Sequence, residues 1–188
     1  MKRYLLSFTA ATTALSLAAC GTKTEPTAEP VETSLENVVE APVAPVVAPG
    51  QAFANTAASS DAFEIATSNL ALEKAQSRTI KTFAQQMVKA HTESTAKLKA
   101  AAGSASPAIT PDATLTPAQQ GKLTALEGKS GAEFDQAYAT EQVAAHQAAL
   151  DALRSYSASA DVPALGAFAT AMAPVVAAHL NMAKSLKP

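Results

Sequence analysis

The three histidines of the chain each end an almost identical run of residues, and this repeat constrains the fold more than any other feature. The runs are MVKAH, QVAAH and VVAAH, which end at His91, His146 and His179. Each histidine has a valine three residues before it and a leucine seven residues after it, and a large apolar residue precedes it by eight residues (His91 and His146) or seven residues (His179). At about 100° per residue these apolar positions fall within about 80° of the histidine on a helical wheel. We therefore predict three helices that each direct an imidazole into a shared core.

Helix start and stop signals divide the second part of the chain into five predicted helices. Alanine, leucine, glutamine, lysine and glutamate dominate this part, which favours helix over strand. The helices are predicted at about 61–76, 78–102, 117–128, 131–158 and 162–186. The link between the last two is short, which requires an antiparallel pair. The predicted fold class is all-α: an antiparallel four-helix bundle with a short additional helix between its two hairpins.

Local motifs refine the ends and the course of these helices. The sequences DAFE, TPAQ and SGAE, which begin at Asp61, Thr116 and Ser130, all resemble capping boxes at helix starts. Pro174 lies inside the last predicted helix, where its ring crowds the carbonyl of Thr170 and offers no N–H. Apolar residues at helical spacing precede this proline, so we predict one bent helix rather than two.

The first predicted helix contains no histidine, but it carries an acidic residue on its predicted apolar face. On a helical wheel Phe63 and Leu70 fall within about 80° of Glu73, whereas Glu64 falls on the opposite side and is predicted to be solvated. A buried carboxylate is costly without a partner, so Glu73 is expected to meet a cation or a hydrogen-bond donor. We predict a buried polar layer with one residue from each long helix: Glu73, His91, His146 and His179.

The N-terminal segment has the pattern of an export signal. Lys2 and Arg3 precede the uncharged, largely apolar stretch YLLSFTAATTALSLAA, which ends in LAAC at Cys20. This ending resembles the lipobox of bacterial lipoproteins, and the resemblance implies cleavage before Cys20 and acylation of that residue. An ordinary cleaved signal with an incidental cysteine is the alternative interpretation. Gly21 is not the acidic residue that resembles an inner-membrane retention signal, so the predicted location is the outer membrane, facing the periplasm.

These patterns predict three segments. Residues 1–19 form a lipoprotein signal peptide, residues 20–60 a lipidated cysteine with a Pro/Glu-rich disordered tether, and residues 61–188 the helical bundle domain. An acidic docking peptide is an alternative role for the tether. Cys20 is the only cysteine, which excludes an intramolecular disulfide. The net charge of −2 gives no reason to expect a nucleic-acid partner, and the membrane is the predicted partner through the lipid.

Three stretches resemble a known family. They are FAQQMVKAHTESTAKLKAAA at 83–102, FDQAYATEQVAAHQAALD at 134–151 and FATAMAPVVAAHLNMAKSL at 168–186. In these stretches the chain is similar to the domain-of-unknown-function 4142 (DUF4142) family, exported bacterial proteins with a ferritin-like helical bundle. Members commonly carry an acidic residue just before the first histidine, where this chain has Ala90. The resemblance implies a ferritin-like fold and an envelope location, but no particular reaction.

The polar layer supports two functional hypotheses. In the first, the chain is a lipid-anchored envelope protein whose histidines are satisfied core residues, with Glu73, Gln142, Thr95 or a backbone carbonyl as partners. In the second, the four layer residues bind one divalent transition metal (zinc, copper or iron), and the protein serves in metal handling or oxidative-stress defence. The sequence indicates no other cofactor and identifies no protein partner.

The sequence lacks the residues that several classes of enzyme require. A di-iron carboxylate centre uses Glu-x-x-His on two helices, but valine stands three residues before every histidine here. The sole cysteine is assigned to the lipid, and no serine lies on a recognisable nucleophile elbow. No glycine-rich phosphate loop is present. We therefore predict a protein that is not an enzyme.

The lipobox generates the first testable prediction. Cys20→Ser removes the thiol that accepts the acyl chain, so metabolic labelling with a fatty-acid probe should mark the parent protein and not the variant. Equal labelling of both proteins would show that Cys20 is not the anchor.

Overall fold

The computed structural model describes residues 47–187, which form five α-helices and no strand. The helices are α1 (Pro49–Lys74), α2 (Arg78–Gly103), α3 (Pro117–Glu127), α4 (Gly131–Ala158) and α5 (Pro163–Lys184). The predicted all-α class is confirmed, and the bounds of α2 to α5 agree closely with those expected from the sequence. The predicted signal peptide, Cys20 and most of the predicted tether lie outside the described residues.

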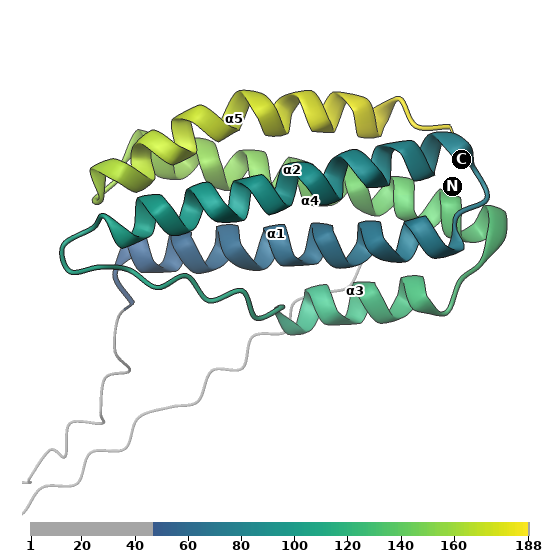
Figure 1. The fold of residues 1–188 in the computed structure, drawn as a ribbon, viewed down its shortest axis with the longest axis horizontal. Coiled ribbons are helices and arrows are strands. Elements are labelled where there is room, and N and C mark those ends of the chain that lie inside the picture. The colour runs from purple at the N-terminus through teal and green to yellow at the C-terminus, as the bar shows by residue number, and fades with distance from the viewer. Residues whose placement is uncertain (1–46, 188) are drawn as a thin grey trace, which may run out of the picture. The chain divides into compact units, whose positions relative to one another are not determined.

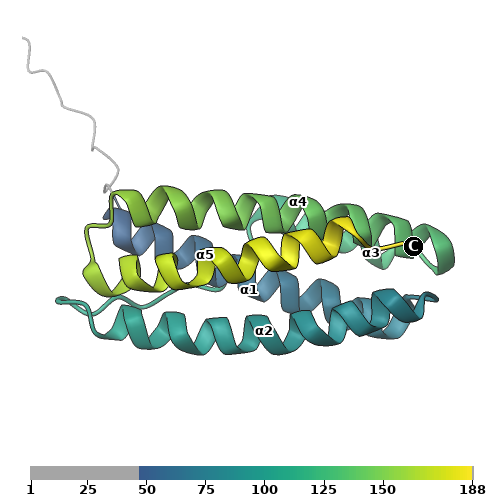
Figure 2. The ribbon, with the colours of Figure 1, turned by 90° about the horizontal axis from the view of Figure 1, so that it is seen from above.

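The four long helices lie side by side, and each contacts two of the others. Helix α1 packs against α2 and α4, and α5 packs against the same two helices from the opposite side (Figures 1 and 2). Short links at 75–77 and 159–162 join α1 to α2 and α4 to α5, so the helices of each pair run in opposite directions. Helix α3 lies outside this group, against α1 and α4.

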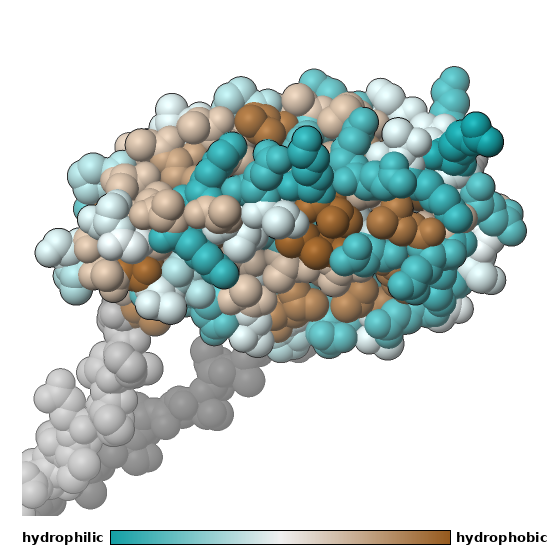
Figure 3. All heavy atoms as spheres, viewed as in Figure 1, coloured by the Kyte–Doolittle hydropathy of each residue, from teal (hydrophilic) through white to brown (hydrophobic). Residues whose placement is uncertain are grey.

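The buried apolar residues form two clusters. One includes Phe53, Leu98 and Leu150, and the other includes Ile80, Phe83 and Phe134. The histidines occupy chain positions between the two clusters on both α2 and α4. On the face that Figure 3 shows, apolar patches are separated by hydrophilic side chains, as expected for helices that bury one side.

Helix α1 begins at Pro49, twelve residues before the predicted start. The predicted boundary between tether and domain at residue 61 is therefore wrong, and the predicted capping box at Asp61 lies in the middle of a helix. Contacts with residues far away in the sequence stabilise these additional N-terminal turns of α1. The ring of Phe53 stacks on Tyr156 with centroids 4.0 Å apart, and the N–H of Gly50 donates to Asp161 Oδ2 over 3.1 Å.

The remaining local predictions had mixed outcomes. The capping box at Thr116 is present, with both of its reciprocal hydrogen bonds to Gln119. Ser130 makes no side-chain cap, and Glu133 pairs instead with Lys129. Helix α5 continues through Pro174 as one helix, and its direction changes along its length in Figures 1 and 2, as predicted.

Phe53 provides a test of the N-terminal turns of α1. Phe53→Ala removes a buried ring that packs on Tyr156 and Phe168, so the free energy of unfolding should fall by about 3–5 kcal/mol in chemical denaturation. Val47 is exposed and lies just before α1, so Val47→Ala is the matched control and should change little. A negligible effect of Phe53→Ala would mean that the first turns of α1 do not belong to the stable core.

Candidate metal centre

The three histidines meet in the interior of the domain. His91 comes from α2, His146 from α4 and His179 from α5, and all three side chains are buried. Their ring centroids are 5.5 Å (His91–His146), 5.9 Å (His91–His179) and 5.6 Å (His146–His179) apart. One ring nitrogen from each lies within 4.8 Å of one from each of the others. The predicted convergence of the histidines is confirmed.

The fourth residue predicted for this layer is placed wrongly. Glu73 is exposed near the C-terminal end of α1 and does not join the histidines. The residues of α1 at the level of the histidines are Asp61 and Glu64, which are both buried. The prediction that Glu64 is solvated is therefore also wrong.

The position of Asp61 beside His91 could have been predicted from the register of the α1–α2 hairpin. Asp61 and His91 stand fifteen residues before and after Gln76, the middle residue of the link between α1 and α2. Residues equidistant from the turn of an antiparallel helical hairpin lie at similar heights, because each residue adds about 1.5 Å of rise. This register, applied to the first histidine, identifies Asp61 rather than Glu73.

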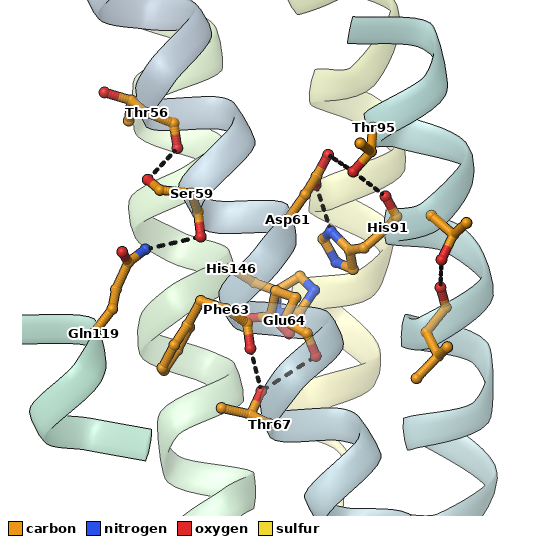
Figure 4. A network of polar contacts seen from close by, with 12 residues as sticks. Thr56, Ser59, Asp61, Phe63, Glu64, Thr67, His91, Thr95, Gln119 and His146 are labelled. Atoms are coloured by element: carbon orange, nitrogen blue, oxygen red, sulfur yellow. Dashed lines mark hydrogen bonds and ion pairs between the residues drawn. The ribbon is translucent and has the colours of Figure 1, made fainter. Parts of the chain in front are cut away.

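Asp61 holds the imidazole of His91 in a defined orientation. His91 Nδ1 and Asp61 Oδ1 are 2.8 Å apart, and the other carboxylate oxygen accepts a hydrogen bond of 3.1 Å from the hydroxyl of Thr95 (Figure 4). A carboxylate can only accept, so Nδ1 carries the proton in this pair. Nε2 of His91 is the nitrogen that remains for another partner.

A backbone carbonyl orients the second histidine. His146 Nδ1 lies 2.8 Å from the carbonyl oxygen of Gln142, one turn earlier on α4, and must donate to it. Nε2 of His146 is therefore also free. Glu64 Oε1 lies 3.8 Å from His146 Nδ1, on the side of the ring away from the free nitrogen.

Six buried side-chain atoms in the described part of the chain lack a hydrogen-bond partner, and all belong to this region. They are Nε2 of His91 and His146, Nδ1 of His179, both carboxyl oxygens of Glu64 and Oε1 of Gln142. Buried polar atoms are rarely left unpaired, so such a group requires an explanation. The hypothesis that the histidines are satisfied core residues accounts for one nitrogen of His91 and of His146, but not for the three nitrogens without a partner.

Burial determines the charge of this region. It lowers the pKa of His146 and of His179 to about 4, with a further lowering from the charge of His91. Burial is also the largest single influence on His91 and lowers its pKa, but the hydrogen bond that His91 donates to Asp61 and the charges of Glu64 and Asp61 together outweigh it and raise the pKa. Burial raises the pKa of Glu64 to about 7.

The donor set suits a transition metal. Metal–imidazole bonds of about 2.0–2.1 Å place ligand nitrogens roughly 3.5 Å apart, so nitrogens within 4.8 Å of one another need only a small inward movement. At neutral pH the low pKa values leave His146 and His179 unprotonated, which is the form that binds metals. Three buried imidazole nitrogens without a hydrogen bond therefore fit one metal ion.

The family is shown by a comparison of the whole chain with family models. The model described as "Domain of unknown function (DUF4142)" matches residues 37–186. The chain belongs to the DUF4142 family. The DUF4142 match begins before α1 and therefore includes the helical turns that the sequence-based boundary at residue 61 excluded.

One solved structure shares the fold of this DUF4142 chain. It is "CopM in the Cu(II)-bound form", with a TM-score of 0.61 and 16% sequence identity. The alignment covers 72% of this chain and 93% of the CopM chain. At this identity the likeness establishes a common fold. No curated protein matches the chain.

Glu64 generates a pH-dependent prediction for the metal-free protein. Its pKa is about 7 in the folded state and 4.5 ordinarily, so the folded protein retains a proton that the unfolded chain loses between these values. Its contribution therefore lowers stability as pH rises through this window, by roughly 3 kcal/mol in total. Glu64→Gln should be more stable than the parent at pH 8 by up to this amount and nearly unchanged at pH 4.5, as measured by chemical denaturation.

The exposed Glu73 offers the matched control for this experiment, because Glu73→Gln removes the same charge from the same helix. Its effect on stability should be small at both pH values. An equal gain for Glu64→Gln at pH 4.5 and pH 8 would show that the ionised buried carboxylate is not the source of the effect.

Proposed function

We propose that this protein binds one copper ion, as Cu(II), between His91, His146 and His179 and serves in copper handling in the cell envelope. One observation carries the proposal: three buried histidines from three helices bring one ring nitrogen each within 4.8 Å of the others, and each histidine has a buried ring nitrogen without a hydrogen-bond partner. Metal binding is the interpretation that gives all three a partner at once.

Two considerations favour copper among the metals that suit imidazole. Affinities of nitrogen sites for divalent ions increase toward Cu(II) and fall again at Zn(II), so a three-imidazole set binds Cu(II) most strongly. The solved structure with the same fold is a Cu(II)-bound form of CopM. Zinc can occupy the same ligands with lower affinity, and iron is less favoured in the absence of a carboxylate among the three convergent groups.

The residues at the proposed site have two different roles in binding the metal, as ligands and as groups that orient the ligands. His91, His146 and His179 supply the ligand nitrogens, while Asp61 and the Gln142 carbonyl fix the orientation of two rings. The proton that the raised pKa of His91 retains must leave when a metal binds. Bound copper would provide a redox-active ion, and the surrounding side chains would keep it largely away from bulk water. We propose storage or transfer of the ion rather than catalysis.

A cavity adjoins the proposed centre. It has a volume of about 40 Å³ and is lined by Asp61, His91 and Ser94 together with apolar residues that include Met172 and Val176. This space is sufficient for one water molecule. A water molecule there has polar neighbours in Asp61 and Ser94, and we propose this cavity as the position from which a further small ligand approaches the metal.

The fold and the location complete the proposal. We propose that the four long helices form an antiparallel, ferritin-like four-helix bundle, supported by their pairwise packing and by the short links at 75–77 and 159–162. We further propose that acylated Cys20 anchors the domain to the outer membrane on the periplasmic side, as the LAAC sequence suggests. Two or more acyl chains suffice to hold a protein on a bilayer.

Metal analysis and titration test the proposed centre. The purified parent should bind one equivalent of Cu(II) per chain, and the His91→Ala/His146→Ala double variant should lose at least 100-fold in affinity, because two of three ligands are gone. Thr92 and Gln147 are the exposed residues that follow these histidines, so Thr92→Ala/Gln147→Ala is the matched control and should bind like the parent.

Two outcomes would contradict the proposal. Either the parent fails to bind Cu(II) and Zn(II) under these conditions, or the double histidine variant retains the affinity of the parent while remaining folded. In both cases the buried layer would serve the structure of the domain and not a metal.

A further inference from the structure

Two carboxyl side chains from a single turn of α1 lie behind the proposed ligands. Asp61 and Glu64 are three residues apart, which places them on the same side of the helix. Asp61 meets Nδ1 of His91 and Glu64 lies nearest to Nδ1 of His146, in each case on the side of the ring opposite the free Nε2. We do not count Asp61 and Glu64 among the ligands, because the three residues whose ligand atoms converge are all histidines.

Two buried carboxyl groups lie beside the three histidines, at 2.8 Å from Nδ1 of His91 (Asp61) and 3.8 Å from Nδ1 of His146 (Glu64). No lysine or arginine occurs among the buried residues of the described chain, so only the histidines or a bound cation can neutralise the two acids. A buried carboxylate requires a positive partner or a proton. A divalent ion with three neutral imidazoles carries two positive charges, which two carboxylates balance.

The burial of Glu64 is a second observation that points to a bound cation in this region. Its side chain is 2% exposed, and neither carboxyl oxygen makes a hydrogen bond of good geometry, although the neighbouring side chain of Gln142 lowers its pKa in part. A polar group of this kind is costly to bury for the sake of folding alone. Asp61, by contrast, has two partners, His91 and Thr95.

On the basis of the proposed copper site, we infer that Asp61 and Glu64 are positioning and charge-balancing residues that make the centre select divalent over monovalent copper. The attraction between an ion and a nearby carboxylate scales with the charge of the ion, and it is stronger in a buried site than in water. Loss of one carboxylate therefore weakens Cu(II) binding more than Cu(I) binding. The selected species is a divalent cation, and the carboxylates act through the field they create and through the ring of His91.

The two acids act in distinguishable ways. Asp61 orients His91 by a direct hydrogen bond, so its loss affects the binding of either copper ion as well as the charge balance. Glu64 does not determine the orientation of His146, because the carbonyl of Gln142 already does so. Its effect is therefore one of charge, and Glu64→Gln isolates that effect.

The experiment compares Cu(II) and Cu(I) affinities of the full chain by competition with chelators at pH 8. Glu64→Gln should weaken Cu(II) binding by about 10–100-fold, the usual effect of a residue behind a metal ligand, and change Cu(I) binding by less than about threefold. A tenfold change in the ratio corresponds to a rise of about 59 mV in the midpoint potential of the bound copper. Asp61→Asn should weaken binding of both ions and shift their ratio in the same direction.

The controls separate charge from structure. Glu64→Asp retains the charge and should preserve the preference for Cu(II), whereas Glu73→Gln removes an exposed charge from the same helix and should leave both affinities unchanged. Circular dichroism melts establish that each variant is folded, and if Glu64→Gln does not fold, Asp61→Asn reports the same ratio.

Failure of this inference differs from failure of the proposed function. If the parent binds copper but neither Glu64→Gln nor Asp61→Asn alters the ratio of Cu(II) to Cu(I) affinity, the charge-balancing role is overturned and the copper site stands. If the parent binds no copper, the proposed function itself is overturned.

Discussion

Unpaired imidazole nitrogens are unfavourable inside an apolar core, and three histidines that each carry one meet in this domain. Much of the structure around them serves to hold them there. The carboxylate of Asp61 and a carbonyl on α4 fix two of the rings, and apolar clusters on both sides keep solvent away. This arrangement is costly for folding alone, and under the proposed function one cation would both satisfy the nitrogens and compensate the acids.

The repeat around the histidines was sufficient to predict where they point. Each run combines a valine and large apolar residues at helical spacing, and the large apolar residue before each histidine is buried in α2, α4 and α5, whereas Val88 and Val143 are only partly buried. Short links could only join antiparallel neighbours, so the order of the helices also followed from the sequence. These features could be predicted from the sequence because they depend on local periodicity and on the length of the links between helices, which neighbouring residues determine.

Helix α1 could not be predicted in the same way, for two physical reasons. Its start depends on Phe53 packing against Tyr156, a contact between residues far apart in sequence. Its buried side consists largely of small residues, which allow neighbouring helices to approach closely, and a wheel built on large apolar residues therefore pointed to the wrong side. The small buried residues are Gly50, Ala54, Ala58, Ser59, Thr67, Ser68 and Ala71. Glu73 was chosen from that wrong side, whereas Asp61 and Glu64 share the true one.

The division of the core into two apolar clusters has a consequence for how the domain holds together. Each cluster draws on all four long helices, and the level between them contains the buried polar side chains of Asp61, Glu64 and the three histidines. Under the proposed function, an ion bound at that level would tie α2, α4 and α5 together and would stabilise the folded state alone, by mass action. Metal occupancy would then link the two apolar clusters, so that both ends of the domain unfold as one cooperative unit.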